Sequence, residues 1–222
     1  MMAEHSRSEP SEFSELAMHL AAAGREFFRR GWVLGTSGNF SAVVSHEPLR
    51  LAITSSGVDK GSLTAADVLQ VDGDAKVIHG IGRPSAETKL HIVVVRFRRA
   101  AAVLHTHSVW GTILSEAHAG ESGLSIEGYE MLKGLEGVTT HEHSEWLPII
   151  ANCQDADTLA QSVEDALTRY PDAHAFLIRR HGLYTWGRTI AEAQRHVEIL
   201  EFLLEVVGRT KSGRQGGYQI EP

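Results

Sequence analysis

The chain has 222 residues, of which 42% are hydrophobic and 22% are charged. This composition is ordinary for a globular protein, and it excludes a fibrous repeat or a mainly disordered chain. The formal net charge of -7 at pH 7 argues against a nucleic-acid partner, because contacts to a phosphate backbone need a basic surface.

The first half of the chain predicts a helix followed by two hairpins. Residues 1–10 are polar and predict a flexible arm. Apolar residues then recur at helical spacing from Phe13 to Phe27, and Gly31 stops the helix. Alternating patterns and turn residues predict short strands over 42–44, 49–54, 68–71 and 76–79, with a short helix capped by Thr64 between the two pairs.

The second half predicts alternating helices and strands. Ser85 is the expected cap of a helix that ends near Phe97. Beyond it we expect strands over 100–107, 146–150, 175–180 and 183–186, and helices over 109–117, 129–135, 155–170 and 189–207. Residues 209–222 are rich in glycine and polar side chains and predict a flexible tail. Because no repeat or long linker divides the chain, residues 11–208 predict a single α/β domain.

Two histidines end one of the predicted buried strands. His105 and His107 lie at positions i and i+2, so their side chains point to the same face of a strand. His181 ends a second apolar strand, and if the two strands are neighbours, three imidazoles converge. Three protein ligands with an open fourth position are typical of a catalytic zinc site. The same pair would also suit packed or surface histidines.

A rival pair with the same spacing is His141 and His143, which flank Glu142. The surrounding segment, 139–145, is polar, and the pattern suggests no third ligand. We therefore favour a solvated hairpin for this pair.

Two loops of small polar residues predict an anion site. Their unhindered N–H groups, hydroxyls and amide suit a phosphate dianion. Ser85 adds the start of a helix, where the helix dipole also favours an anion, and Lys60 could supply charge. The candidate phosphate-binding residues are Ser37, Gly38, Asn39, Ser55, Ser56, Gly57, Lys60 and Ser85. Each loop alone would suit a simple turn, but together with a metal they suggest a small phosphorylated substrate.

Two glutamates lie near these features. Glu87 is in the first turn of the helix expected at Ser85, and Glu130 lies in the segment 128–134. By spacing alone, Glu87 suits a helix-end acid and Glu130 a solvated helix face. Neither stands out without further information.

The motifs together resemble the class II aldolase/adducin superfamily, from about Phe13 to Val207. The resemblance depends on five segments in the same order: 35–41, 54–57, 84–88, 105–108 and 180–182. It implies a three-layer α/β/α fold around a central, largely antiparallel sheet. It also implies one Zn²⁺ per subunit held by His105, His107 and His181, and a homotetramer with active sites near subunit interfaces.

Three further segments, 129–134, 137–142 and 181–187, are similar to the methylthioribulose-1-phosphate dehydratases of methionine salvage within that superfamily. This resemblance implies a small phosphorylated ketose as substrate and Glu130 as the catalytic acid/base. The sugar-phosphate aldolases of the superfamily use the position of Glu87 instead. Because the chain has both glutamates, a sugar-phosphate aldolase or a pentulose-phosphate epimerase stays open. A non-catalytic, adducin-like binding module would need a lost metal site.

The remaining signals concern the compartment. Cys153 is the only cysteine, so an internal disulfide or a cysteine-based zinc cluster is excluded. The start of the chain lacks the apolar core of a signal peptide, and no apolar run approaches the ~20 residues of a membrane span. We expect a cytoplasmic protein with no membrane or nucleic-acid partner.

Overall fold

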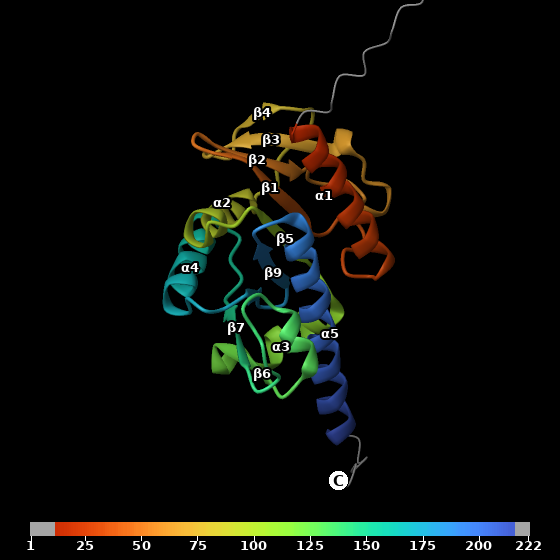
Figure 1. Cartoon of the computed structure of the whole chain (residues 1–222), viewed down its shortest axis with the longest axis vertical. Coiled ribbons are helices and arrows are strands. Elements are labelled where there is room, and N and C mark those ends of the chain that lie inside the picture. The colour runs from red at the N-terminus through yellow and green to blue at the C-terminus, as the bar shows by residue number, and fades with distance from the viewer. Residues whose placement is uncertain (1–11, 216–222) are drawn as a thin grey trace, which may run out of the picture.

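The computed structural model describes residues 12–215 and places a nine-stranded sheet at the centre of the chain (Figure 1). The strand order is β4-β3-β2-β1-β5-β9-β8-β7-β6. Neighbouring strands are antiparallel except for β7 and β8, which are parallel. The strands are β1 (Asn39–His46), β2 (Leu49–Thr54), β3 (Val68–Asp72), β4 (Val77–His79), β5 (Ala102–Thr106), β6 (Gly123–Glu127), β7 (Ser144–Ile150), β8 (Ala175–Ile178) and β9 (Gly182–Gly187).

Helices cover both faces of this sheet. They are α1 (Glu12–Arg29), α2 (Thr88–Arg98), α3 (Val109–Ala117), α4 (Ala156–Arg169) and α5 (Ile190–Gln215). Figure 1 shows α2 beside α4 on one side of the sheet and α1 and α5 on the other, where α3 packs against α5. The three-layer, largely antiparallel architecture is confirmed.

The alternation of side chains along the strands explains the two faces. In β5, Val103 packs into the cluster formed with α2 and α4, whereas Leu104 packs into the cluster formed with α1 and α5. In β2, Leu51 and Ile53 likewise face α2, and Ala52 faces α1. Strands buried on both faces therefore carry continuous apolar runs, as the central strands of a three-layer sheet require.

Capping side chains set where several helices begin. The Ser108 side chain accepts a hydrogen bond from the Gly111 N–H at the start of α3. Asp155 accepts from the Thr158 N–H at the start of α4. Thr64 and Asp67 form a capping box around a 3₁₀ turn at Ala65–Asp67, as the sequence predicted.

The structure differs from the predicted elements in four places. Helix α2 begins at Thr88 rather than at Ser85, because the Ser85 hydroxyl accepts the Glu87 N–H at 3.2 Å in the preceding turn. The helix expected over 129–135 is a 3₁₀ turn, Glu130–Gly134. Strand β6 was not predicted, and α5 continues to Gln215, past the predicted end near Val207. The predicted arm over 1–10 lies outside the described residues, as does the tail from 216 to 222.

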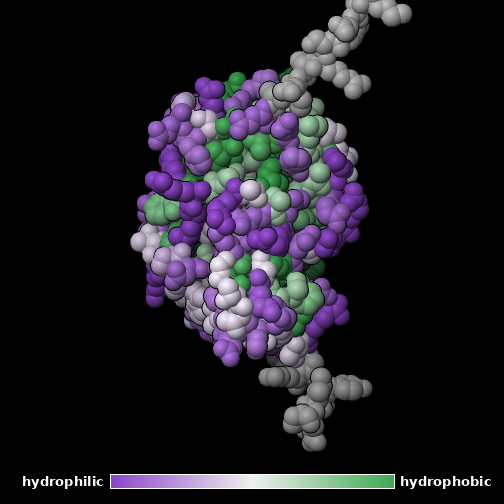
Figure 2. All heavy atoms as spheres, viewed as in Figure 1, coloured by the Kyte–Doolittle hydropathy of each residue, from purple (hydrophilic) through white to green (hydrophobic). Residues whose placement is uncertain are grey.

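Within residues 12–215, none of the helices has the length and hydropathy needed to cross a membrane. Hydrophilic side chains cover much of the face seen in Figure 2, and hydrophobic ones show between them in the upper half, where strands β1 to β3 lie.

Candidate metal centre and substrate hollow

The three predicted histidines meet at one end of the central strands. β5 and β9 are antiparallel, and Thr106 lies opposite Leu183, so the turn before β9 brings His181 beside His107. The Nε2 atom of His107 lies 2.8 Å from that of His105 and 3.1 Å from that of His181, and the third separation is 3.3 Å. The predicted convergence of the three imidazoles is confirmed.

The protonation of His105 and His107 suits a metal ion. The Nδ1 of His105 lies 2.9 Å from the Leu183 carbonyl oxygen, which can only accept, so Nδ1 carries the proton and Nε2 presents a lone pair. Burial holds the pKa of His105 well below its ordinary value, and burial together with His181 lowers the pKa of His107 to about 4. Neutral imidazoles are the form that binds a metal. Nitrogen ligands of tetrahedral zinc lie about 3.3 Å apart, close to the separations found here.

Glu87 lies beside two of these nitrogen atoms. Its Oε1 is 3.0 Å from the His181 Nε2, and its Oε2 is 3.6 Å from the His105 Nε2. Burial alone would raise the pKa of this carboxyl, but the hydrogen bond from His181, the imidazoles of His105 and His181 and the Asn39 amide together hold the pKa well below its ordinary value. Glu87 is therefore an ionised carboxylate at the site.

A buried chain of hydrogen bonds orients Glu87. The Asn39 Nδ2 donates to the Glu87 Oε2 at 2.7 Å, and the Asn39 Oδ1 is bonded to the His91 Nε2. The His91 Nδ1 lies 2.7 Å from the Ser41 hydroxyl oxygen. Burial lowers the pKa of His91 to about 4, so this ring is neutral. Sequence reasoning missed His91, although its position one helical turn after Glu87 is a usable signal.

Tyr184 and Glu201 pack against the strand that carries His105 and His107. The Tyr184 ring stacks on His105 with a centroid separation of 3.8 Å. Glu201 of α5 is buried and accepts a hydrogen bond from the hydroxyl of Thr106, the residue between the two histidines of β5. Sequence reasoning missed both residues. Their signal was indirect, since each is a polar side chain within an apolar pattern.

Two glycines are required by close backbone contacts at the site. A Cβ on Gly182 would lie 1.9 Å from the Thr106 carbonyl oxygen. Gly38 has a φ of +73°, and a Cβ there would lie 2.7 Å from the His105 carbonyl oxygen. The backbone around the histidines therefore tolerates no side chain at either position.

The small polar loops and two of the three histidines line one hollow of about 140 Å³. Its walls include Glu87, His107, His181 and seven of the eight predicted phosphate-binding residues: Ser37, Gly38, Asn39, Ser55, Ser56, Gly57 and Ser85. Some backbone donors of these loops are already used, because the N–H groups of Ser37 and Ser56 bond to the carbonyl oxygens of Leu34 and Arg83. Two hydroxyls of the loops also donate within the chain, that of Ser37 to the Leu34 carbonyl oxygen at 2.7 Å and that of Ser55 to the Arg83 carbonyl oxygen at 3.3 Å, so their oxygens keep acceptor capacity while their protons are used.

Lys60, the eighth residue, lies beneath the loops instead of lining the hollow. Only 1% of its surface is exposed, and its Nζ donates to the carbonyl oxygens of Thr36 at 3.2 Å and Val58 at 2.9 Å. Burial lowers the pKa of this amine. Lys60 therefore joins the two loops from below, and its charge is buried close to them.

Glu130 is not brought to the hollow of its own chain. Its side chain is 71% exposed and forms an ion pair with Lys133, with the His141 Nδ1 3.8 Å away. The turn that carries it packs on α5 through a bond from the Arg195 Nε to the Gly134 carbonyl oxygen at 3.0 Å. This part of α5 lies beside the end of β9, whereas the three histidines lie at its beginning.

The rival pair does not act as a unit. His141 lies in a turn with an exposed side chain, as expected for a solvated connection between β6 and β7. His143 instead contacts Glu145 and the His174 ring, a residue that sequence spacing did not connect with it.

Comparisons with known proteins agree with this site. The chain matches the family described as Class II Aldolase and Adducin N-terminal domain over residues 18–207. It is 43% identical to a methylthioribulose-1-phosphate dehydratase of Marinobacter nauticus over 196 residues, which are 88% of this chain and 93% of that protein. It is 47% identical to the protein of that name from Xanthomonas oryzae pv. oryzae over 192 residues, 86% of this chain and 84% of the other.

Solved structures show the same fold. The L-fuculose-1-phosphate aldolase of Thermus thermophilus superposes with a TM-score of 0.73 at 25% identity, covering 92% of this chain and 100% of that one.

Proposed function

Because the chain belongs to the class II aldolase and adducin family, we propose that it is a hydro-lyase that removes water from 5-methylthioribulose 1-phosphate. The product is 2,3-diketo-5-methylthiopentyl 1-phosphate, an intermediate of methionine salvage in the cytoplasm. The observation that carries this proposal is the convergence of three imidazole Nε2 atoms, an ionised carboxylate and two small polar loops on one hollow.

The polar loops bind the phosphate in this proposal. Their residues line the hollow, and Lys60 places a buried positive charge beneath both loops. Holding the phosphate, which does not react, supplies binding energy remote from the reacting carbons and fixes their position.

His105, His107 and His181 hold one divalent cation, which we propose is zinc. When bound, this cation would act as a Lewis acid toward the oxygens of the ketose and favour the enediolate. The ring orientation is set in advance, because Leu183 fixes the tautomer of His105 and Tyr184 stacks on its face.

Glu130 is the proposed acid/base. It takes the proton from C3, and the same carboxylic acid then protonates the C4 hydroxyl as the C4–O bond breaks and water leaves. The resulting enol takes up a proton at C4 to give the 2,3-diketone. Acid–base assistance of this kind is typically worth about 10²–10⁴ in rate.

Glu130 must then act on the hollow of a neighbouring subunit. In its own chain Glu130 is exposed and pairs with Lys133, and it is not among the residues that line the hollow. A homotetramer with active sites near its subunit interfaces, which we also propose, would bring the exposed Glu130 of one copy to the histidines of another. Glu87 stays with the histidines of its own chain.

The direct test uses purified protein, zinc and methylthioribulose 1-phosphate. We expect a product lighter by one water in the mass spectrum, with the dicarbonyl absorbance of a diketone. A zinc-loaded protein that leaves the substrate unchanged contradicts the dehydratase assignment. Glu130→Gln should keep its zinc and fold but lose most of its activity, whereas a Glu87→Gln variant that is the more severely impaired of the two would assign the base to Glu87.

Mixed oligomers test whether Glu130 acts between subunits. Glu130→Gln keeps the histidines, and His181→Ala keeps Glu130. If sites form between copies in a ring, an equal mixture refolded together should regain about a quarter of wild-type activity, although each variant alone is inactive. A mixture as inactive as its parts would show that base and metal act within one chain.

One observation favours a second candidate, a sugar-phosphate aldolase or pentulose-phosphate epimerase. Glu87, rather than Glu130, lies 3.0 Å from the His181 Nε2 in the same chain. An aldolase would deprotonate the C4 hydroxyl and break the C3–C4 bond, so formation of dihydroxyacetone phosphate from a ketose phosphate would support it. The complete set of histidines argues against a non-catalytic, adducin-like module.

A further inference from the structure

A second cluster of histidine and carboxylate side chains lies at the opposite end of the sheet. His143 immediately precedes β7, Glu145 is the second residue of β7, and His174 immediately precedes β8. β7 and β8 are parallel, so their first residues lie at the same edge. β8 is antiparallel to β9, with Ala175 opposite Thr185, which places this edge away from the turn that carries His181.

Glu145 is the centre of the cluster. Only 1% of its side chain is exposed. Its Oε1 accepts the His174 N–H at 3.0 Å, which fixes the plane of the carboxylate. Its Oε2 lies 2.9 Å from both the His143 Nε2 and the His174 Nδ1. A buried carboxylate requires compensating positive charge, from a paired cation or a metal.

The tautomer of His174 is fixed by its other nitrogen. The Nε2 lies 2.8 Å from the Glu136 carbonyl oxygen, so Nε2 carries a proton. In the neutral ring, Nδ1 then presents a lone pair to the lone pairs of the Glu145 Oε2. These two atoms lie 2.9 Å apart, so either a second proton on Nδ1 or a metal ion lies between them, and Glu145 favours positive charge there. A metal-ligating histidine usually donates its other ring N–H to a carbonyl or carboxylate, and the Nε2 of His174 makes that bond to the Glu136 carbonyl oxygen.

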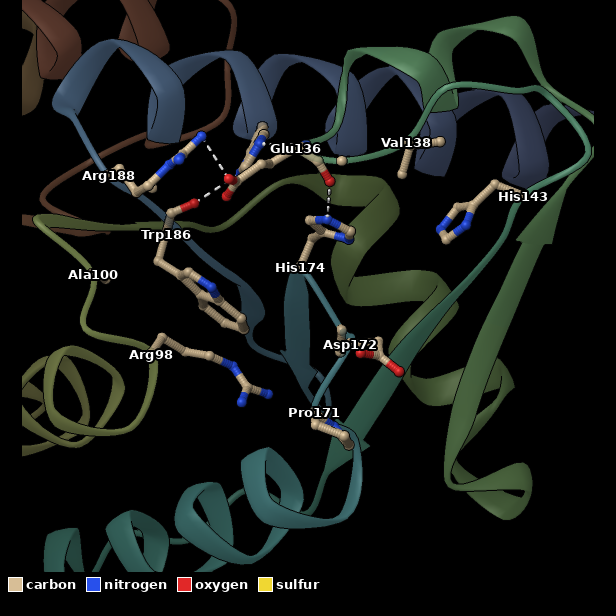
Figure 3. A pocket seen from close by; sticks show the side chains of 14 residues that line it. Arg98, Ala100, Glu136, Val138, His143, Pro171, Asp172, His174, Trp186 and Arg188 are labelled. Atoms are coloured by element: carbon tan, nitrogen blue, oxygen red, sulfur yellow. Dashed lines mark hydrogen bonds and ion pairs between the residues drawn. The ribbon is translucent and has the colours of Figure 1, made fainter.

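A cavity adjoins the two imidazoles. It has a volume of about 390 Å³ and is lined by His143, His174 and Glu136, among others. Figure 3 shows the rings of His143 and His174 in this cavity, with His174 bonded to Glu136. Solvent in the cavity can therefore supply the ligands that the protein does not.

We infer that His143, Glu145 and His174 form a second divalent-metal site, distinct from the three histidines at the other end of the sheet. The donor atoms His143 Nε2, Glu145 Oε2 and His174 Nδ1 all lie within 4.8 Å of one another, so small side-chain movements bring them to one ion. Two imidazoles and one carboxylate select a transition metal such as Zn²⁺ over Mg²⁺ or Ca²⁺. The ion joins the first residues of β7 and β8 and, through His174, the backbone at Glu136.

Metal stoichiometry in a chain without the first site tests this inference. The full-length His105→Ala/His107→Ala variant is stripped with a chelator, equilibrated with Zn²⁺ and freed of excess metal by gel filtration. We expect about one zinc per chain by atomic emission, and after loading with Co²⁺ a visible absorption band of a nitrogen- and oxygen-ligated ion. This measurement is independent of activity and therefore of the proposed function.

Two further substitutions in that background locate the ion. His143→Ala should lower the zinc content at least tenfold, because it removes one of three ligands from a partly exposed position. His141→Ala, two residues away and exposed, is the matched control and should leave the content unchanged. The inference is overturned if the folded His105→Ala/His107→Ala chain binds no zinc. It is also overturned if adding His143→Ala to that chain leaves its zinc content unchanged.

If the His105→Ala/His107→Ala chain does not fold, the zinc contents of the wild type and of the single variant His143→Ala test the same inference. About two zinc ions per chain are expected for the wild type and about one for His143→Ala. Equal zinc contents for these two proteins contradict the second site, whatever their activity.

Discussion

The fully buried acid behind the histidines makes a quantitative prediction about stability. Glu201 lies on α5 with 2% of its surface exposed. Burial raises the pKa of its carboxyl to about 7, although hydrogen bonds with Ser108 and Thr106 act in the opposite direction. The perturbation is Glu201→Gln, which keeps the shape and the acceptor oxygen but cannot ionise.

The magnitude follows from the difference between the folded and unfolded pKa values. The pKa of about 7 in the folded chain compares with an ordinary value of 4.5, and each unit corresponds to about 1.4 kcal/mol. Between these pH values the folded chain holds a proton that the unfolded chain has lost. The stability that Glu201 contributes is therefore fully present below pH 4.5 and is lost as the pH rises through about 7.

We expect the free energy of unfolding of the wild type, relative to Glu201→Gln, to fall by about 2–3 kcal/mol from about pH 5 to 8. Urea unfolding followed by circular dichroism measures it, with a chelator present and both proteins at the same concentration, so that metal binding and association do not enter the difference. Glu198→Gln, on the same helix with a half-exposed side chain, is the control for replacing a glutamate of α5 outside the core. The reasoning would be refuted if the free energy of unfolding of the wild type, minus that of Glu201→Gln, stayed constant or rose with pH.

Two other substitutions test how the hollow is built. Lys60→Met keeps the apolar stem of the side chain but removes its hydrogen bonds to both loops. The KM for the phosphorylated substrate should therefore rise about tenfold, with a smaller effect on kcat. The control is Lys76→Met at an exposed position, which should change neither constant. Gly182→Ala places a Cβ against the Thr106 carbonyl oxygen. Thermal unfolding should therefore show a loss of about 2 kcal/mol or more in the free energy of unfolding, and zinc analysis should show a lower zinc content. Gly120→Ala, where the added Cβ meets open space, should match the wild type in both measurements, and a Gly182→Ala variant as stable as that control would contradict the steric argument.

The spacing of residues predicted the parts of the site that depend on local geometry. His105 and His107 share a face because strand side chains alternate, and that followed from the sequence alone. The meeting with His181 required β5 and β9 to be neighbours, which periodicity does not specify and which the family resemblance supplied. Residue spacing therefore predicted contacts within one strand, but it could not predict contacts that depend on which strands are neighbours in the sheet.

The backbone decides where two predicted polar side chains lie. Lys60 was expected to supply charge to the phosphate site, and its amine lies beneath the loops because the carbonyl oxygens of Thr36 and Val58 bind it there. Ser85 was predicted to cap a helix, but its hydroxyl belongs to the turn that precedes the helix. A sequence pattern shows that a polar group is available, and the backbone decides which partner it finds.

Glu87 and Glu130 show the limit of the sequence most clearly. Both are acids next to predicted helix starts, and nothing in their spacing separates a catalytic role from a solvated one. The fold separates them, because Asn39 and His91 hold Glu87 beside the imidazoles, whereas Glu130 is exposed, pairs with Lys133 and does not line the hollow of its own chain. If Glu130 is the base, catalysis requires a second copy, and the same geometry that keeps the two glutamates apart in one chain lets each subunit complete the site of its neighbour.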